Sequence, residues 1–413
     1  MTAGTSGAAS RSGGPAAGLP LLEDLGEVAG RSVLLRLDLN VPLTEGPGGA
    51  RVVADDFRIR AALPTLRFLL DGGAKVTVVT HLGRPKGRPD ERFSVAPVEA
   101  RLAELGAAVE VRENLRFSPA EEEGSDELVA ELVAGQDLFV NDAFGVMHRA
   151  HASVVGPPRY LPSAAGRLVE REVAALSPLI ESPPRPYVVV LGGSKVSDKL
   201  GLLRTLAARA DRVLVGGGMA FTFLAALGHE VGDSILDPDH LDECRALLTG
   251  SSVVTLPVDV VAAAPGVALE PRHARGSDAA VPPPAGLTRV VGQDVPEGWR
   301  GLDIGPATAE LFREAIAGAG AVMWNGPMGV FEDPRFALGT REVATAVATA
   351  RAYTVVGGGD SAAALDRFGL ADGVDHVSTG GGASLELLEH GDLPGLAALR
   401  EAPRVQGRMP GEG

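Results

Sequence analysis

Four glycine-rich segments in the second half of the chain could bring the backbone close to a phosphate group. Each follows a short apolar run and opens an expected helix, whose first N–H groups can meet phosphate or ribose oxygens. One such segment is weak evidence, because loops between strands and helices often use glycine merely to turn. Four of them in one half predict a nucleotide or a similar phosphate ligand. The segments are 192–195 (GGSK), 216–218 (GGG), 357–360 (GGGD) and 380–382 (GGG).

Charged side chains accompany two of these segments. Lys195 and Lys199 lie four residues apart at an expected helix start, so that they project from one helical face. Two exposed lysines on a helix are usually solvated, but their place after a strand and a Gly-Gly turn favours phosphate binding. Asp360 could cap its helix or bind magnesium beside a phosphate. The chain has no G-x-x-x-x-G-K-[ST] motif and no G-x-G-x-x-G after its first strand, which excludes a P-loop and disfavours a dehydrogenase.

The first half presents arginines and histidines at its expected strand ends. Guanidinium groups bind phosphate and carboxylate through paired N–H donors, so this crest suits a small, multiply anionic molecule. One such arginine alone would more often be solvated or paired with an acidic neighbour. Four at matching topological positions favour a ligand. The residues are Asp38 and Asn40; Arg58; His81, Gly83 and Arg84; Asn114 and Arg116; Asn141 and Asp142; and Arg149 with His148 and His151.

An anionic acceptor on one half and a nucleotide on the other indicate phosphoryl transfer between two domains that close on each other. The sequence has no Ser–His–Asp pattern and no metal-ligand spacing such as H-E-x-x-H. Phosphoryl transfer needs little beyond positioning and charge neutralisation, so the missing motifs are consistent with it.

Short β-branched runs alternate with helical patterns and must position these residues. Strands that are apolar throughout, rather than alternating, are typical of a parallel sheet covered on both faces, and the alternation predicts doubly wound α/β architecture. The leucines of 57–73 recur every three or four residues, which predicts a helix that stops at Gly-Gly. The expected strands are 32–39, 75–80, 109–113, 137–141, 187–193, 212–218, 252–257, 321–327, 353–359 and 376–382.

Length and composition set the frame. With 413 residues, 45% of them hydrophobic and 22% charged, the chain is long enough for two or three domains and is not globally disordered. A net charge of −15 argues against wrapping nucleic acid or lying on anionic lipid. The single cysteine, Cys244, excludes an intramolecular disulfide and fits a reducing cytoplasm. We find no apolar run that would span a membrane and no signal peptide, and expect a cytoplasmic protein.

The best domain boundary is an expected long helix over 163–182, which closes at a proline cluster. A second stretch, 271–300, is rich in Pro, Gly and Ala and predicts a surface loop. We therefore divide the chain into a flexible extension (1–20), an N-terminal domain (21–162), a hinge helix and linker (163–186), a C-terminal domain (187–395) and a tail (396–413).

Taken in order, the motifs of the chain closely resemble those of the phosphoglycerate kinase family. They are RLDLNVP (36–42), RIRAALPT (58–65), THLGRP (80–85), ENLRF (113–117), VNDAFGVMHRAHAS (140–153), LGGSKVSDKL (191–200), GGGMAFTFL (216–224), GLDIGPAT (301–308), WNGPMGVFE (324–332), GGGDSAAA (357–364) and STGGGASLELLE (378–389). The resemblance implies two doubly wound, Rossmann-like domains joined by a hinge helix. It implies 3-phosphoglycerate on the N-terminal domain, Mg-ADP or Mg-ATP on the C-terminal one, and a monomer.

The resemblance also implies a role for each matching residue. For catalysis it implies Arg58, Lys195 and Gly358. For the binding of phosphoglycerate it implies Asp38, Leu39, Asn40, Arg58, His81, Leu82, Gly83, Arg84, Arg116 and Arg149. For the nucleotide it implies Lys195, Lys199, Gly301, Asn325, Glu332, Gly357, Gly358, Gly359, Asp360 and Ser361, with Asp360 also on magnesium.

The sequence departs from the family pattern in two places. Ser194 stands where the family often has alanine, and the stretch between about 106 and 113 is shorter by roughly one β–α unit, which predicts a smaller N-terminal sheet.

Two other interpretations of the function stay open. The chain could be a kinase of a related small carboxylate, or a non-catalytic descendant that binds nucleotide or a protein partner. Retention of Lys195, Arg58 and Asp360 weighs against the latter.

Overall fold

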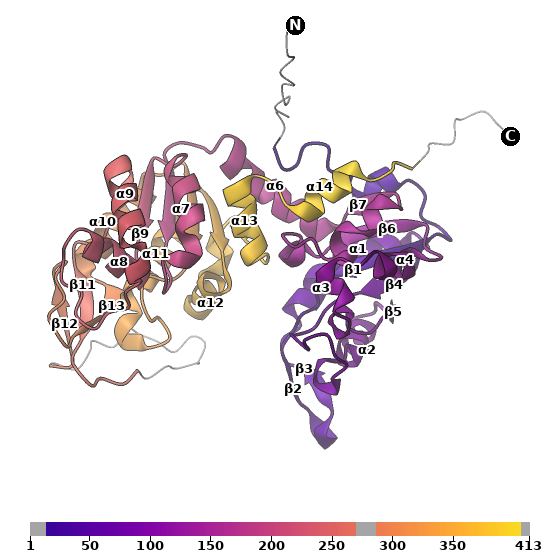
Figure 1. Cartoon of the computed structure of the whole chain (residues 1–413), viewed down its shortest axis with the longest axis horizontal. Helices are drawn as coiled ribbons and strands as arrows, with labels where there is room; N and C mark the ends of the chain where they lie inside the picture. Colours follow the sequence, from indigo (N-terminus) through magenta and orange to yellow (C-terminus); the bar gives the residue numbers. More distant parts are fainter. Residues whose placement is uncertain (1–13, 270–285, 406–413) are drawn as a thin grey trace, which may run out of the picture. The chain divides into compact units, whose positions relative to one another are not determined.

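The computed structural model describes residues 14–269 and 286–405, and the chain divides into two compact units (Figure 1). The first unit comprises Met1–Ser177 and Gly391–Gly413, and the second comprises Pro178–His390. The division falls within one helix, α6 (Arg167–Glu181). Each unit has its own sheet and its own buried core, and each is described separately below.

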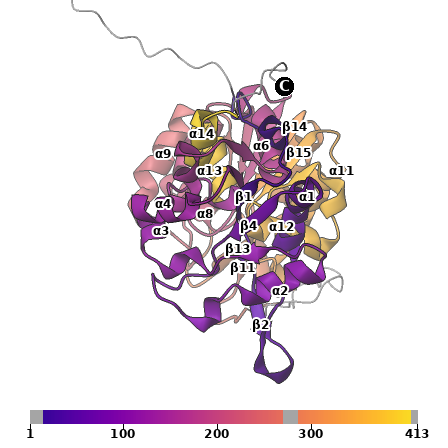
Figure 2. The same cartoon turned by 90° about the vertical axis from the view of Figure 1, so that its right-hand side faces the viewer.

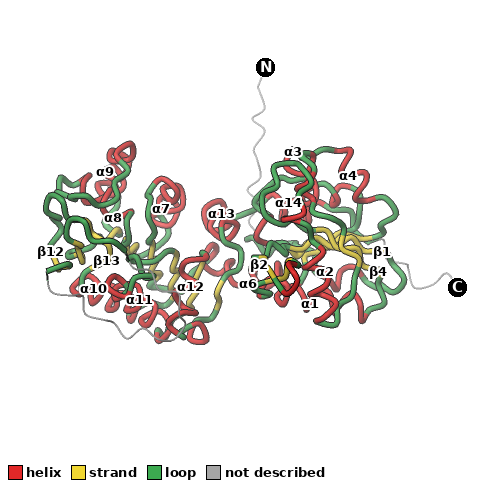
Figure 3. The backbone as a smooth tube through the Cα atoms, turned by 90° about the horizontal axis from the view of Figure 1, so that it is seen from below, coloured by secondary structure: helices red, strands yellow, loops and turns green. Residues whose placement is uncertain are grey.

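The first unit is built on a parallel sheet in the order β5-β4-β1-β6-β7. Its strands are β1 Ser32–Leu37, β4 Lys75–Val79, β5 Glu110–Val111, β6 Leu138–Asp142 and β7 Ser163–Ala165. Its helices, besides α6, are α1 Phe57–Asp71, α2 Ala96–Glu104, α3 Ala120–Glu123, α4 Asp126–Val133, α5 Ala152–Val155 and α14 Pro394–Glu401. Figure 3 shows α1 and α2 on one face of this sheet and α3, α4 and α14 on the other.

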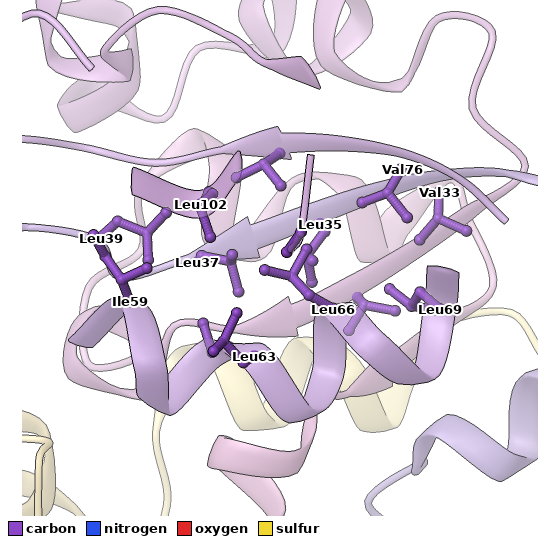
Figure 4. Close-up of a cluster of buried hydrophobic side chains, with 14 of the residues drawn as sticks. Val33, Leu35, Leu37, Leu39, Ile59, Leu63, Leu66, Leu69, Val76 and Leu102 are labelled. Carbon is purple, nitrogen blue, oxygen red and sulfur yellow. The ribbon is translucent and has the colours of Figure 1, made fainter. Parts of the chain in front are cut away.

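The core of the first unit lies between β1 and α1. Figure 4 shows Leu35 and Leu37 of β1 facing Leu63 and Leu66 of α1, and these side chains are buried in one apolar cluster. The helix ends where the sequence predicts, because Gly72 is its C-cap and donates its N–H to the carbonyl of Phe68. A small antiparallel hairpin, β2 (Leu43–Glu45) and β3 (Arg51–Val53), projects from this unit (Figure 2).

The second unit is built on a parallel sheet in the order β10-β9-β8-β14-β15-β16. Its strands are β8 Tyr187–Leu191, β9 Arg212–Val215, β10 Val254–Thr255, β14 Ala321–Asn325, β15 Tyr353–Gly357 and β16 His376–Val377. Its helices are α7 Leu200–Ala207, α8 Met219–Ala226, α9 Leu241–Gly250, α10 Pro306–Ala317, α11 Leu338–Thr349, α12 Gly359–Phe368 and α13 Gly382–His390. Figure 3 shows α7 and α9 on one face of the sheet and α10, α11 and α12 on the other. The predicted α/β class with two parallel, doubly wound sheets is confirmed.

The structure corrects the prediction of a surface loop over 271–300. A three-stranded antiparallel sheet, in the order β12-β11-β13, uses part of this stretch. Its strands are β11 Val260–Ala263, β12 Thr288–Val291 and β13 Arg300–Ile304. The remainder of the predicted loop, 270–285, lies outside the described residues. Strand β12 was not predicted because the stretch around it is rich in Pro and Gly, and because its central residues are exposed and show no apolar alternation.

A second correction concerns the predicted helix over 163–182. Helix α6 begins only at Arg167, and residues Ser163–Ala165 form the edge strand β7, which runs parallel to β6. Three small residues give too short an apolar run to be read as a strand in a sequence. They are buried because the sheet partner exists only in the folded chain.

The ends of the predicted N-terminal domain also shift. Residues 14–20 of the predicted flexible extension lie against the first unit, where Pro20 accepts a hydrogen bond from the N–H of Ala165, while 1–13 lie outside the described residues. Helix α14, which we placed partly in a C-terminal tail, belongs to the first unit. Its Leu396 and Leu399 are buried, and the N–H of Gly395 donates to the carbonyl of Met147 at 2.9 Å.

The order of strands places a reversal at the centre of both sheets. In the first unit the chain starts at β1, adds strands on one side, and then returns to β6 on the other side. In the second unit it starts at β8 and returns to β14 in the same way. Ligands of open α/β sheets bind at such reversals, beyond the carboxyl ends of the strands. Asp38 and Asn40 follow β1 and Lys195 follows β8, while His81 and Arg84 follow the neighbouring strand β4 and Gly358 follows β15.

Candidate functional site

The loops after β1 and β4 hold the polar crest of the first unit together. The side-chain oxygen of Asn40 accepts a hydrogen bond from the N–H of Gly83 at 2.8 Å. Asp38 forms an ion pair with Arg58, which stands in the first turn of α1. The N–H of Leu39 donates to the Thr80 hydroxyl at 3.0 Å. These contacts join residues that the sequence placed on separate strand ends.

Asn114 fastens the next strand end to the same crest. Its amide group exchanges two hydrogen bonds with the backbone of Leu82, one accepted at 3.2 Å and one donated at 2.7 Å. Its Oδ1 also accepts from the N–H of Arg116, and the guanidinium of Arg116 donates to the carbonyl of Gly83 at 2.9 Å. Asn114 is therefore a structural anchor that fixes two predicted binding residues.

The cationic side chains of the crest lie close enough to influence one another. Burial lowers the pKa of Arg116, and the nearby charges of Arg149 and Arg84 lower it further, while Glu122 at 3.2 Å opposes them. Arg84 and Arg149 are exposed, and Arg149 donates to a ring nitrogen of His148. An anion bound here would relieve this mutual repulsion.

Three buried residues behind the crest were not among the predicted site residues. Arg36, Glu121 and Ser153 form a hydrogen-bonded chain that ends at His81. Their partners stand far apart in sequence, so no local pattern indicates the chain. A charged residue inside an otherwise apolar strand, as in 32–37, is the one signal that points to Arg36.

The second unit contains a cavity of about 270 Å³ at the reversal between β8 and β14. Three of the predicted nucleotide residues, Gly301, Glu332 and Asp360, line it. Backbone from the loop after β8 and from the loop after β14 closes one side, since the N–H of Gly193 donates to the carbonyl of Pro327 at 3.1 Å. Its lining is Gly193, Ser194, Gly217, Gly218, Ala220, Phe221, Ile235, Pro257, Val260, Gly301, Leu302, Asp303, Ile304, Pro327, Met328, Gly329, Val330, Glu332 and Asp360.

The apolar residues Phe221 and Met328 line this cavity but were not among the predicted site residues. A Cβ on Gly301 would stand 2.1 Å from the ring of Phe221, so a side chain at 301 would collide with the cavity wall. Phe221 comes from α8, and Met328 comes from the loop after β14. Both lie in motifs that carry the family resemblance, but nothing in their spacing distinguishes a ligand-facing residue from a core residue.

The remaining predicted nucleotide residues form a linked group beside the cavity. Asn325 donates its side-chain N–H to the carbonyl of Gly357, and the Ser361 hydroxyl accepts from the N–H of Gly326 at 2.6 Å. Gly358 has a φ of +89°, and a Cβ there would lie 2.6 Å from the Asn325 amide nitrogen, so both the turn and the contact require glycine. Gly359 and Asp360 follow, exposed in the first turn of α12.

The two predicted lysines differ in their surroundings. The ammonium of Lys199 donates to the carbonyl of Gly192 at 2.6 Å and lies 3.3 Å from that of Asn325. Burial lowers the pKa of Lys199 to about 8, against the attraction of Asp360. Lys195 is exposed, two residues after Gly193 of the cavity lining. Lys199 is therefore held in place, whereas Lys195 extends from the loop.

Three carboxylate residues, Asp303, Glu332 and Asp360, line the cavity, and Asp360 is the one that the sequence predicts for magnesium. Among the described residues, no group of three or more His, Cys, Asp or Glu side chains could hold a metal ion by itself. Mg²⁺ commonly binds through one or two carboxylates together with nucleotide phosphates, and Asp360 on the cavity lining fits that pattern.

Within the described ranges, no helix is long and apolar enough to cross a membrane.

Sequence comparison gives a consistent assignment. The sequence model of the family described as phosphoglycerate kinase matches residues 22–112 and 106–391. The two stretches overlap at 106–112, where we expect the chain to be shorter than its relatives, and the shortening itself stays a prediction. Phosphoglycerate kinase of Frankia casuarinae is 50% identical over 412 residues, covering 92% of this chain and 99% of the relative. That of Rubrobacter xylanophilus is 48% identical over 404 residues, covering 92% of this chain and 98% of the relative.

Solved structures agree with the sequence comparison. Phosphoglycerate kinase from Coxiella burnetii matches with a TM-score of 0.79 and 37% identity, over 90% of this chain and 97% of that one. The enzyme from Pyrococcus horikoshii matches with a TM-score of 0.75 and 32% identity, over 93% of this chain and 99% of that one. The resemblance inferred from the motifs is confirmed: the chain belongs to the phosphoglycerate kinase family and is a kinase whose phosphoryl acceptor is a carboxyl group.

Proposed function

We propose that the chain transfers a phosphoryl group reversibly between 1,3-bisphosphoglycerate and ADP, giving 3-phosphoglycerate and ATP in glycolysis, with the residues assigned below. The observation that carries the proposal is the division of chemistry between the units. The first gathers Arg58, Arg116 and other cations at a strand reversal, and the second has a glycine-lined cavity beside Lys199. One suits a phosphorylated carboxylate and the other a nucleotide.

In the first unit, Asp38 and Asn40 would bind the hydroxyl and neighbouring oxygens of phosphoglycerate. Backbone groups of Leu39, Leu82 and Gly83 would complete this wall, and their hydrogen bonds to Thr80, Asn114 and Asn40 support a fixed geometry. The cationic side chains would hold the substrate phosphate and the transferring group. These are Arg58, His81, Arg84, Arg116 and Arg149.

In the second unit, Gly301 and Glu332 would lie beside the adenosine, with Glu332 suited to the ribose hydroxyls. Lys199 would bind a nucleotide phosphate, because its ammonium is already positioned by two carbonyls. The remaining residues would line the phosphates through backbone and hydroxyl groups. These are Asn325, Gly357, Gly358, Gly359 and Ser361. Asp360 would bind Mg²⁺ jointly with those phosphates.

The transfer needs no general base, since the acceptor carboxylate is already ionised at neutral pH. Arg58 and Lys195 would neutralise the charge that spreads over the equatorial oxygens, and amides such as that of Gly358 would add fixed dipoles. Magnesium, when bound, supplies further charge neutralisation on the nucleotide phosphates. The protein's contribution is thus positioning and electrostatics.

Substitution of Lys195 by alanine tests this assignment. Lys195→Ala should leave ADP affinity within a few-fold but remove most turnover of 3-phosphoglycerate with Mg-ATP, because its exposed ammonium is assigned to the transferring group. Turnover is read by coupling 1,3-bisphosphoglycerate to NADH oxidation, and ADP affinity by calorimetry. Lys86→Ala, which removes another exposed lysine outside the assigned set, is the matched control. Unchanged turnover in Lys195→Ala would remove this residue from the mechanism.

A panel of small carboxylates tests the substrate. If 3-phosphoglycerate is not preferred over unphosphorylated or differently phosphorylated acids, the proposed substrate is wrong even though the kinase chemistry stands. Magnesium dependence, the monomeric state and the cytoplasmic location remain predictions, each open to a direct assay.

A further inference from the structure

Arg36 is a charged side chain enclosed in the core of the first unit. It is only 1% exposed, although it stands in β1 among apolar neighbours. Its guanidinium donates to the hydroxyl of Ser153 at 2.9 Å, to the carbonyl of Leu37, and to Nδ1 of His81 at 3.3 Å. Burying a guanidinium costs free energy unless its charge is paired, and none of these three partners carries a negative charge.

A buried carboxylate completes the arrangement. Glu121 has no exposed surface, and its two oxygens accept from the N–H of Ser153 at 3.0 Å and from the hydroxyl of Ser153 at 2.7 Å. The hydroxyl therefore donates to Glu121 while it accepts from Arg36. The negative charge of Glu121 favours the charged form of Arg36, opposing the effect of burial on its pKa. Glu121 is thus a buried counter-ion of Arg36, connected to it through one serine, and the charge of Asp38 acts in the same direction.

The contact with His81 determines where the imidazole carries its proton. A guanidinium has only N–H donors, so the ring nitrogen that faces Arg36 must accept. Nδ1 of His81 is that nitrogen, and it therefore bears no hydrogen. The single proton of the neutral ring is then on Nε2. A second proton, placed on Nδ1, would point at the cationic donor.

We propose that Glu121, acting through Ser153 and Arg36, holds His81 as a neutral imidazole with its proton on Nε2. The inference rests on the proposed phosphoglycerate site, to which it assigns His81 as an uncharged hydrogen-bond donor. Glu121 and Ser153 are positioning residues, because both are buried and act on the site through other side chains. The path proposed here runs through Arg36 and His81, and Glu121 also lies 3.8 Å from Nδ1 of His151.

The charged groups that act on His81 come from several elements of the first unit. Burial is the main cause that lowers its pKa, and the charges of Arg36 on β1, Arg116 after β5 and Arg58 on α1 lower it further. His151, just before α5, adds a smaller effect of the same sign. The carboxylate of Asp38 is paired with Arg58, and that of Glu121 lies beyond Ser153.

A neutral donor gives the site a constant charge. An ordinary histidine loses its charge between about pH 6 and 7, so a charged His81 would make substrate affinity vary over that interval. Arginines keep their charge throughout the physiological range. With His81 held neutral, the recognition of a multiply anionic substrate rests on arginine charge and is insensitive to small changes in pH.

Nitrogen NMR of the histidine rings tests the proposal on the unaltered protein. Long-range ¹H–¹⁵N correlation separates the two neutral tautomers from the imidazolium, and the signal that disappears in His81→Gln identifies His81. We expect the neutral Nε2–H form between about pH 6 and 8, without a titration step. An imidazolium at pH 6, or a neutral ring with its proton on Nδ1, would overturn the proposal. This measurement needs no turnover, so it is independent of the proposed reaction.

Kinetics of two matched glutamate variants test the role of Glu121. Glu121→Gln should raise KM for 3-phosphoglycerate about tenfold, because Arg36 loses its buried counter-ion, and should change KM for Mg-ATP less than about twofold. Glu123→Gln, an exposed neighbour on α3, should change neither constant. Equal effects in both variants, or a loss confined to kcat, would contradict a positioning role.

The link itself is broken by Ser153→Ala. This variant keeps the backbone N–H that Glu121 accepts and removes only the hydroxyl between Glu121 and Arg36. We expect the ring of His81 to populate both tautomers and KM for 3-phosphoglycerate to become pH-dependent near pH 6 to 7, as for an ordinary histidine. An unchanged tautomer and a flat profile would show that Ser153 does not transmit the effect. If a variant fails to fold, the NMR result on the unaltered protein still decides the proposal.

Discussion

At the scale of single residues, Lys199 combines a charge with a confined position. Its ammonium faces two backbone carbonyls, and burial lowers its pKa to about 8. Below that pH the side chain is charged and can attract phosphate. Above it the free protein loses the proton, and a bound nucleotide must restore it. Nucleotide affinity should therefore fall as the pH rises above about 8.

Calorimetry can detect the proton directly. Near pH 8, ADP binding should take up about half a proton, read from the change of binding heat between buffers of different ionisation enthalpy. Lys199→Arg is the control, because a guanidinium stays charged and should abolish the uptake. The same uptake in Lys199→Arg would assign the proton to another group.

The sequence indicated candidate residues for each site, whose roles stay predictions, but not the contacts that hold those residues in place. Strand ends and glycine spacing pointed to Arg58, His81 and Asp360, because local order along the chain decides which residues follow a strand. The partners of Arg36 could not be found in this way, since Ser153 lies 117 positions away from Arg36 in the sequence and the contact exists only after folding. Buried hydrogen-bond networks leave no periodic signal.

At the scale of elements, the first backbone N–H groups of α6 donate hydrogen bonds to side chains from two other elements. Its first N–H groups, those of Arg167, Leu168 and Val169, are satisfied by the Thr65 hydroxyl and by the carboxylate of Asp142. Asp142 ends β6, so the sheet and the helix are joined at one buried carboxylate. Capping of the first turn removes the unpaired donors that every helix start leaves.

Removal of this carboxylate should destabilise the first unit. Asp142→Ala should cost about 1 to 2 kcal/mol of unfolding free energy, while Asp142→Asn, which keeps an acceptor, should cost less. Denaturant unfolding of the three proteins at neutral pH measures the difference. Equal losses in both variants would show that capping is not the contribution of Asp142.

The same residue predicts a dependence on pH. Burial raises the pKa of Asp142 from 3.8 to about 6 in the folded protein. The folded state then binds this proton more tightly than the unfolded state does, so protonation of Asp142 stabilises the fold. This stabilisation is complete below the unfolded pKa of 3.8 and is lost as the pH rises through about 6. Asp142→Asn should flatten this part of the stability profile, and an unchanged slope between those pH values would contradict the assignment.

Elements with strong apolar runs were predictable, and short edge elements were not. The central strands β1, β8 and β14 fall inside the predicted ranges, and β6 extends one residue beyond its range, to Asp142. They were predictable because burial on both faces demands continuous apolar residues. Strand β7 is three small residues whose burial depends on neighbours from elsewhere. Strand β12 is an exposed edge, where sequence is free to vary.

At the scale of the whole molecule, two separate cores should respond separately to damage. Leu66→Ala opens a cavity in the core of the first unit and should cost about 2 to 5 kcal/mol of its unfolding free energy. ADP affinity, measured at a temperature where the variant is folded, should change less than about twofold, because the cavity proposed for the nucleotide is lined by residues of the second unit. Arg67→Ala, an exposed neighbour on α1, is the control. A large loss of ADP affinity in Leu66→Ala would show that the cores are coupled.

The return of α14 to the first unit has a consequence for biosynthesis. The first unit is discontinuous, since Gly391–Gly413 follow the entire second unit in the chain. On a ribosome the second unit is therefore translated in one uninterrupted piece, whereas the first waits for Leu396 and Leu399 to cover its surface. The unit that we propose binds the acceptor is completed last, although its synthesis starts first. A chain released without residues 391–413 should consequently contain a complete second unit and an incomplete first unit, which is a target for chaperones.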